Sequence, residues 1–135
     1  MPLLVDTGVL YALADRSDAW HARCVALVKT TAERLLAPAP VLPEAAYLLA
    51  SRLGASVERR FVRSLADEEV AVENLRVVDY ARVHAVMQAY PDIGFVDASL
   101  VAVAERLKLE TIATTDRRRF TAIRPAHFER FTLLP

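Results

Sequence analysis

The feature that most constrains the fold of this chain is a series of short apolar runs in which hydrophobic residues follow one another without alternating with polar ones. Strands of this kind have both faces buried, which is typical of a parallel sheet covered by helices on each side. The runs that predict strands are Leu3–Val5, Leu35–Ala37, Val70–Val72, Thr111–Thr114 and, at an edge of the sheet, Phe128–Leu134.

Helical patterns fill the intervals between these runs. We expect helices over Val9–Ala14, Ala19–Glu33, Val41–Leu53, Val57–Leu65, Asp79–Ala89 and Val96–Leu107, the last one apolar almost all round and therefore buried. Strands that alternate with helices define an α/β fold with a mostly parallel central sheet flanked by helices. The chain of 135 residues has no linker or internal repeat, so we expect a single domain over residues 1–135.

Composition excludes several classes of protein. Hydrophobic residues make up 54% of the chain, which rules out intrinsic disorder, and no apolar run approaches the roughly 18 residues that a membrane span needs. Cys24 is the only cysteine and the start of the chain has no secretion signal, so we expect a cytoplasmic protein without disulfides. A net charge of zero argues against nucleic-acid binding by bulk charge, but it leaves room for a local basic rim.

Two carboxylates follow predicted strands directly. Asp6 comes after Leu3–Val5, and Asp116 comes after the strand that starts at Thr111. In open parallel sheets the functional crevice lies at the carboxyl ends of the strands, where both side chains would lie. Taken singly, each aspartate could equally be a turn residue or a helix N-cap.

Two further acids begin predicted helices on apolar faces. Asp97 has Leu100, Val101 and Ala104 as its helical neighbours, and a charge on such a face costs several kcal/mol unless something compensates it. Glu44 follows Pro43 in a first helical turn, where a carboxylate can also serve the helix dipole. For each of these two acids, helix capping and a role in a site both stay open.

The four acids are more informative together than singly. Four carboxylates that converge on one crevice repel one another strongly unless a cation neutralises them. Hard oxygen donors without a histidine or cysteine partner favour Mg²⁺ or Mn²⁺ over zinc. Such a cluster is typical of phosphodiester hydrolysis, in which the metal activates water and stabilises the leaving oxygen.

Four segments carry a resemblance to a known family: Asp6-Thr7-Gly8, Pro43-Glu44-Ala45, Gly94 to Ala102, and Thr114 to Phe120. In this order and spacing they resemble the motifs of PIN-domain ribonucleases, and the likeness to VapC-type toxins of type II toxin–antitoxin systems spans nearly the whole chain. The resemblance implies a Mg²⁺- or Mn²⁺-dependent endoribonuclease that acts on structured RNA such as tRNA or rRNA. It also implies a homodimer and a cognate antitoxin protein.

The resemblance assigns roles to individual residues. The metal-binding and catalytic carboxylates are Asp6, Glu44, Asp97 and Asp116, and the nearby hydroxyls are Thr7 and Thr115. Some relatives have one more acid before the helix of Asp97; here that position could be Asp92, although the adjacent Pro91 favours a plain turn.

Three consecutive arginines, Arg117, Arg118 and Arg119, directly follow Asp116. At least one of them is expected to contact an RNA phosphate, because a guanidinium matches phosphate geometry with two donors. The alternatives are a solvated turn and an internal ion pair with one of the carboxylates.

Two other functions remain as alternatives. A receiver-type signalling domain is also a small α/β fold with strand-end aspartates, but it requires an acidic pair after the first strand, where this chain has Asp6 and Thr7. It also requires a lysine at a late strand end, where this chain has Arg117. A catalytically inactive PIN domain that only binds RNA is the third interpretation, and the presence of all four acids disfavours it.

Overall fold

The computed structural model describes residues 1–127 and 129–135 as one open sheet with helices on both faces. Its strands are β1 (Leu3–Val5), β2 (Leu35–Pro38), β3 (Ala71–Glu73), β4 (Thr111–Ala113) and β5 (Thr132–Leu134). Its helices are α1 (Thr7–Ala14), α2 (His21–Thr30), α3 (Val41–Leu53), α4 (Ala55–Ala66), α5 (Val77–Ala89), α6 (Phe95–Leu107) and α7 (Arg117–Thr121).

The sheet is parallel throughout, with the strand order β3-β2-β1-β4-β5. Leu4 of β1 lies opposite Leu36 of β2 on one side and opposite Ile112 of β4 on the other. The predicted α/β fold with a parallel central sheet is therefore confirmed. A receiver domain has the order 2-1-3-4-5, so the strand order excludes that alternative.

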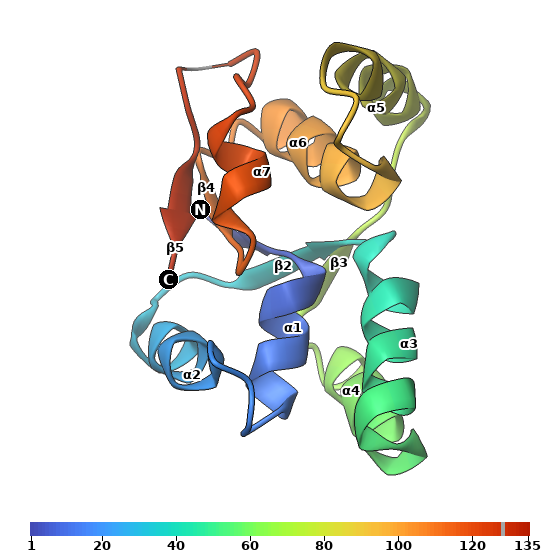
Figure 1. The fold of residues 1–135 in the computed structure, drawn as a ribbon, viewed down its shortest axis with the longest axis vertical. Helices are drawn as coiled ribbons and strands as arrows, with labels where there is room; N and C mark the ends of the chain where they lie inside the picture. The colour runs from blue at the N-terminus through green and yellow to red at the C-terminus, as the bar shows by residue number, and fades with distance from the viewer. Residues whose placement is uncertain (128) are drawn as a thin grey trace.

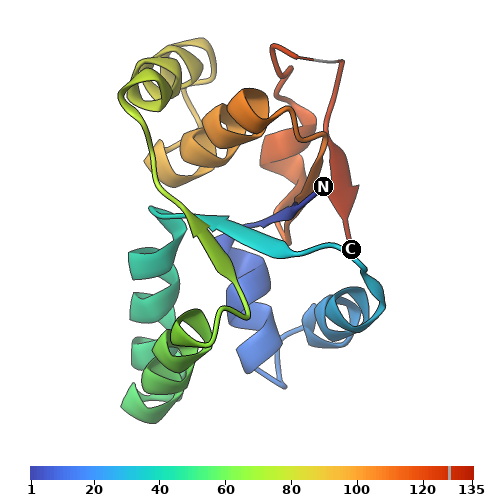
Figure 2. The ribbon, with the colours of Figure 1, turned by 180° about the vertical axis from the view of Figure 1, so that it is seen from behind.

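The helices form one layer on each face of the sheet. Helices α1 to α4 cover one face, and α5, α6 and α7 cover the other, as Figures 1 and 2 show from opposite sides. The chain moves outward from β1 to β3 through the first layer and then returns to β4 and β5 through the second. This reversal follows from the right-handed crossover that parallel strands require, and it puts a switch point between β1 and β4.

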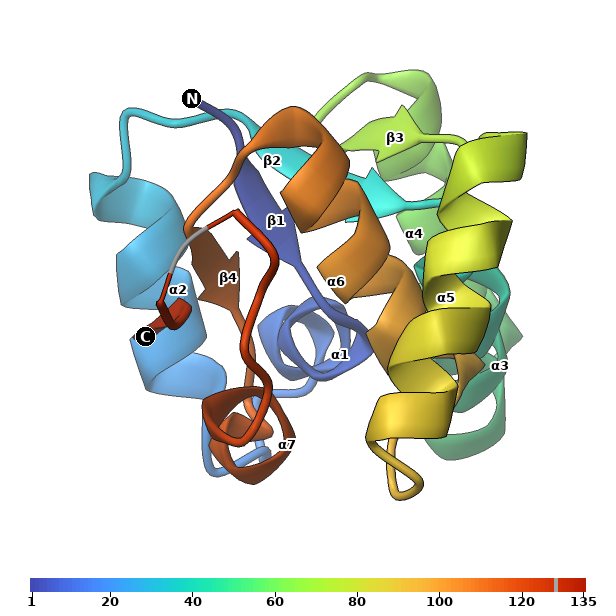
Figure 3. The ribbon, with the colours of Figure 1, turned by 90° about the horizontal axis from the view of Figure 1, so that it is seen from above.

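The core lies on both faces of the sheet, and on one of them α6 crosses over the strands in Figure 3. Every residue from Ala98 to Ala104 is buried, which confirms the expectation for this helix. Leu4, Leu100 and Ile112 are fully enclosed and join the sheet to the helix. Among the described residues, no helix has both the length and the apolarity that a membrane crossing needs.

Several element boundaries differ from the prediction. Helix α2 begins at His21 and not at Ala19, because the backbone amide of Trp20 donates to the Asp18 side chain (2.8 Å) and holds that turn outside the helix. Strand β3 lies one residue later than expected. The edge strand β5 is confirmed only over Thr132–Leu134, and Phe128 lies outside the described residues.

Candidate active site

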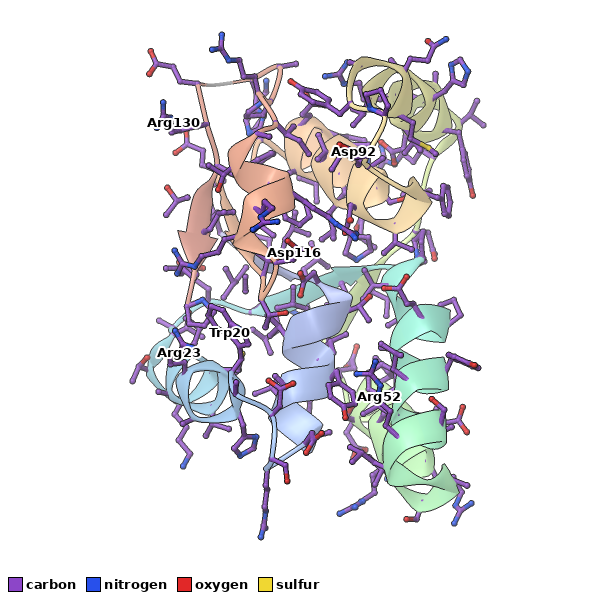
Figure 4. All side chains as sticks on the ribbon, in the orientation of Figure 1. Trp20, Arg23, Arg52, Asp92, Asp116 and Arg130 are labelled. Carbon is purple, nitrogen blue, oxygen red and sulfur yellow. The ribbon has the colours of Figure 1, made fainter. Side chains whose placement is uncertain are left out.

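One pocket of about 270 Å³ brings the four predicted acids together. Asp6, Glu44, Asp97 and Asp116 all line it, although they belong to four separate segments of the chain. It lies where β1 and β4 end side by side, which is the switch point of the sheet. Figure 4 shows Asp116 between α1 and α7, next to this junction.

Asp6 is the most deeply buried of these acids, with 6% of its surface exposed. One carboxylate oxygen caps α1 by accepting from the amide of Val9 (2.9 Å), and the other accepts from the hydroxyl of Thr114. Burial raises the pKa of Asp6 to about 6, opposed by these two hydrogen bonds and reinforced by the charges of Asp97 and Asp116. Asp6 is therefore both a helix cap and an incompletely compensated buried charge.

Thr114 is a site residue that the sequence analysis missed. Its side chain is fully buried, donates to Asp6 and accepts from the backbone amide of Asp116 (2.9 Å). The predicted hydroxyl, Thr115, also lines the pocket, but it packs against Gly8. A Cβ on Gly8 would lie 2.0 Å from Thr115 Oγ1, so only glycine allows α1 to approach the end of β4 this closely.

Thr7, the other predicted hydroxyl, starts α1 with 7% of its surface exposed. Its Oγ1 lies buried and has no hydrogen-bond partner among the described residues, although Thr7 lines the pocket. A buried hydroxyl without a partner costs about 1–3 kcal/mol, which a bound water or ligand can recover. Thr7 thus places a buried hydroxyl with an unmade hydrogen bond beside the pocket.

Asp97 lies in the first turn of α6 with 16% of its side chain exposed. Burial raises its pKa, and the nearby charges of Asp116 and Glu44 add to this, although the guanidinium of Arg119 acts in the opposite direction. Glu44, in the first turn of α3, is exposed and contributes its charge from the rim of the pocket. The pocket therefore holds more negative charge than its own cations balance.

The three arginines after Asp116 have different surroundings. Arg117 donates to the carbonyl of Pro135, and Arg118 is exposed. Arg119 forms the internal ion pair that the sequence left open, because its Nη1 donates to Asp97 (2.6 Å) and its Nε lies 3.1 Å from Asp116. A short helix, α7, takes the place of the turn because Asp116 caps it, accepting from the amide of Arg119 (3.5 Å).

Asp92 is not part of this arrangement. It is exposed in the loop between α5 and α6, away from Asp116 in Figure 4, and it does not line the pocket. A further residue that does line it is Arg52 of α3, whose guanidinium carbon lies 5.1 Å from the ring centroid of Tyr11. No sequence pattern distinguishes Arg52 from the many other scattered arginines.

The donor set of the pocket fits a hard divalent cation. Carboxylate oxygens with a free hydroxyl nearby are the ligands that Mg²⁺ and Mn²⁺ prefer, and no histidine or cysteine lines the pocket. Within the described part of the chain, however, no three acidic, histidine or cysteine side chains stand close enough to hold an ion as they are. Arg119 lies among the acids of the pocket, so their side chains must move before they can surround an ion.

Comparison with known proteins identifies the class to which this fold and site belong. The sequence matches the PIN domain over residues 3–124, and the chain belongs to that family. It is 33% identical over 135 residues to ribonuclease VapC26 of Mycobacterium tuberculosis, an alignment that covers 98% of this chain and 100% of the relative.

Solved structures agree with the fold. A crystal structure of VapC20 of Mycobacterium tuberculosis, described as a sarcin–ricin loop cleaving toxin, superposes with a TM-score of 0.81 and 21% identity over 94% of this chain and 98% of that one. A toxin–antitoxin complex from Klebsiella pneumoniae gives a TM-score of 0.72 and 19% identity over the same shares. At these identities the likeness shows the PIN-type fold.

Proposed function

We propose that this chain is a metal-dependent endoribonuclease and the toxin of a toxin–antitoxin pair. The observation that carries the proposal is the convergence of four acids from four segments on one pocket whose buried carboxylates have raised pKa values. Structural ion pairs in proteins neutralise buried acids, whereas this pocket leaves them short of positive charge. The relatedness to ribonuclease VapC26 over the whole chain supports the same activity.

Asp6 and Asp97 are the proposed chief ligands of a Mg²⁺ or Mn²⁺ ion, with Asp116 and Glu44 completing the shell or orienting water. The ion, when bound, lowers the pKa of a water molecule and neutralises charge on the leaving oxygen. Thr114 and the amide of Val9 donate to the two oxygens of Asp6 and hold this carboxylate in one orientation at the pocket. Thr7 and Thr115 are the proposed supporting hydroxyls at the edge of the pocket.

The reaction is hydrolysis of an RNA phosphodiester. The water oxygen bonds to phosphorus, the bond from phosphorus to the 3′-oxygen breaks, and that oxygen takes up a proton, which leaves 5′-phosphate and 3′-hydroxyl ends. Arg52 and Arg119 line the same pocket and supply donors for phosphate oxygens beside the acids. The predicted phosphate contacts of Arg117 and Arg118 lie at the exposed end of α7.

We propose structured RNA such as tRNA or rRNA as the substrate, in the cytoplasm, and an antitoxin protein as the inhibitor. VapC20 is described as cleaving the sarcin–ricin loop, and the Klebsiella pneumoniae structure is described as a toxin–antitoxin complex. A short antitoxin gene next to the gene for this chain would support the assignment.

A homodimer is part of the proposal. Val77, Val78 and Tyr80 of α5 are 87%, 63% and 54% exposed, and Phe95, stacked on Tyr80 with ring centroids 6.4 Å apart, is 43% exposed. Such a group of large apolar side chains is typical of an interaction surface. Sedimentation of the purified chain at micromolar concentration is expected to give the mass of two copies.

The test of the proposed activity is cleavage of a structured RNA by the purified chain. We expect cleavage with Mg²⁺ or Mn²⁺, none with excess chelator, full recovery when Mn²⁺ is restored, and 5′-phosphate product ends. Asp92→Asn, a neutralised acid outside the pocket, is the matched control and should cleave like the wild type. Cleavage that persists in chelator would refute the metal mechanism, and RNA binding without cleavage under any condition would favour the inactive PIN domain.

A further inference from the structure

Arg119 differs from the other arginines of the described chain because its guanidinium joins two of the four pocket acids. Its Nη1 donates to Asp97 Oδ2 (2.6 Å) and its Nε lies 3.1 Å from Asp116 Oδ2. Asp97 lies in the first turn of α6 and Asp116 caps α7, so a single side chain bridges two elements at the pocket. Both contacted oxygens belong to the acids assigned above to the cation.

The bridge supplies part of the positive charge that the acids require. The carboxylates of Asp97 and Asp116 raise the pKa of Arg119, so the guanidinium stays charged at every relevant pH. Two arginines, Arg52 and Arg119, nevertheless face five carboxylates in the lining of the pocket, and the pKa of Asp97 remains raised in spite of the bridge. The pairing is therefore favourable but leaves the pocket with an excess of negative charge.

The bridge is also built so that it can open. The contact with Asp116 is exposed, because the side chains of Arg119 and Asp116 are 52% and 46% exposed, and exposed ion pairs are individually weak. The contact with Asp97, which is 16% exposed, is the more protected of the two. Arg119 lies in a helix of only five residues at the surface. A divalent cation carries twice the charge in a smaller volume and competes for the same oxygens.

We propose, on the basis of the proposed function, that Arg119 is the resident counter-ion of the acidic pocket: it pairs with Asp97 and Asp116 in the metal-free protein and leaves them when a divalent cation binds. The displaced guanidinium remains at the rim of the pocket, where it can donate to an RNA phosphate. Arg119 is thus a positioning residue that couples metal binding to the exposure of a phosphate-binding group.

Calorimetric titration of Mn²⁺ into the metal-free chain tests this role. Arg119→Gln removes the competing cation, and Arg118→Gln is the matched control, since it lies in the same helix, is exposed and changes net charge equally. We expect Arg119→Gln to bind Mn²⁺ about five- to tenfold tighter than the wild type, the gain from losing a weak two-contact ion pair, and Arg118→Gln to stay within about twofold. The metal-free melting temperature of Arg119→Gln should fall, because the pocket acids lose their counter-ion.

The outcomes separate this proposal from the proposed function. Equal or weaker Mn²⁺ affinity in Arg119→Gln, with normal binding by the wild type, would overturn the counter-ion role and leave the metal site standing. Absence of Mn²⁺ binding by the wild type would refute both.

A second measurement uses the wild type alone and does not depend on how a variant folds. Phenylglyoxal modifies accessible guanidinium groups, and mass spectrometry of peptides gives the rate at each arginine. Saturation with Mn²⁺ should raise the rate at Arg119 several-fold and leave the rate at Arg118 unchanged. An unchanged rate at Arg119 would contradict its displacement.

Discussion

The acidic pocket and the ion-pair network between α5 and α6 use the same kinds of side chain to opposite effect. In the α5–α6 network, Asp79 is 2% exposed and both of its oxygens accept from Arg106 Nε (2.9 and 3.0 Å), while one also accepts from the amide of Arg76 (2.9 Å). Burial would raise the pKa of Asp79, but these hydrogen bonds and charges outweigh it and lower the pKa. In the acidic pocket, burial outweighs the partners of Asp6 and Asp97 and raises their pKa values.

The α5–α6 network is also balanced in charge once Arg76, whose charge acts on Asp79, is counted with Arg82 and Arg106. Arg106 pairs with Glu73 (3.0 Å) as well as Asp79, and Arg82 pairs with Glu105 (2.6 Å). A buried carboxylate with enough hydrogen-bond donors holds two helices together. Buried carboxylates without enough cations repel one another, and a bound ligand can relieve this repulsion. The direction of the pKa shift therefore separates Asp79, which joins two helices, from Asp6 and Asp97, which are proposed to bind the ion.

The largest expected effect is on activity, at Asp97. Asp97→Asn keeps the shape but removes the charge, so RNA cleavage should fall at least about 1000-fold, beyond the 10–100-fold cost of losing a group that only supports a metal ligand. Metal-free stability should be unchanged or higher, because the substitution relieves repulsion in the pocket. Cleavage and thermal melting of the same preparation check this. A large drop in melting temperature with activity retained would instead make Asp97 a helix cap.

Asp79 should behave in the opposite way. Asp79→Asn leaves Arg106 as a buried charge with reduced pairing, so the free energy of unfolding in urea should fall by about 3–5 kcal/mol. Cleavage per folded molecule should not change. The matched control is Asp67→Asn, in the exposed pair with Arg63 (3.2 Å), which should shift stability by less than about 1 kcal/mol. Equal losses of stability in Asp79→Asn and Asp67→Asn would show that the buried ion pair contributes no more than the exposed one.

The raised pKa of Asp6 predicts a pH dependence of stability. Its ordinary value of 3.8 applies to the unfolded chain, and its value in the folded protein is about 6, so between these pH values the folded state holds a proton that the unfolded state has lost. The stabilisation from this proton is complete below pH 3.8 and is lost as the pH rises through 6.

Urea unfolding of the metal-free wild type and of Asp6→Asn at several pH values measures this loss. The free energy of unfolding of Asp6→Asn minus that of the wild type should increase by about 2–3 kcal/mol between pH 3.8 and pH 6, because asparagine does not titrate. A difference that does not change with pH would mean that Asp6 titrates normally.

The smallest expected effect concerns the contact of Gly8 with Thr115. Gly8→Ala should lower the free energy of unfolding by about 1–2 kcal/mol through overpacking, and Thr115→Ala in the same chain should restore part of it. Gly94→Ala is the control, since a Cβ at Gly94 would meet nothing within 4 Å. Additive effects of the two substitutions would show that the two positions do not interact, and that the cost of Gly8→Ala has another origin.

Much of the fold could be predicted because the strands are continuous apolar runs and the helices are long. Helix α6 was predictable to within one residue, since its apolar surface extends all round and Gly94 precedes it. Helix α7 was not, because five residues with three arginines carry no apolar periodicity, and its stability depends on the side chain of Asp116 acting as a cap. The order of the strands depends on contacts between residues that are far apart in the sequence, and a short apolar run does not show which other strand it pairs with.

The four acids were predictable as a set because each follows a strand or begins a helix. Which threonine holds Asp6 was not, because the choice between Thr114 and Thr115 depends on which neighbour faces β1 once the sheet has formed. The role of Arg119 was one of three open alternatives, because three consecutive arginines look equivalent until the short helix turns only one of them toward the acids.

The most direct test of the central claim, that the acidic pocket holds the ion that cleaves RNA, is one Mn²⁺ titration with two readouts from the same samples. Bound Mn²⁺ is measured from the loss of the free-ion electron paramagnetic resonance signal, and the RNA cleavage rate is measured in parallel, for the wild type and for Asp97→Asn. Binding and cleavage should rise together in the wild type and be lost together in Asp97→Asn. Cleavage that saturates without bound Mn²⁺, or Asp97→Asn that binds and cleaves like the wild type, would contradict the central claim.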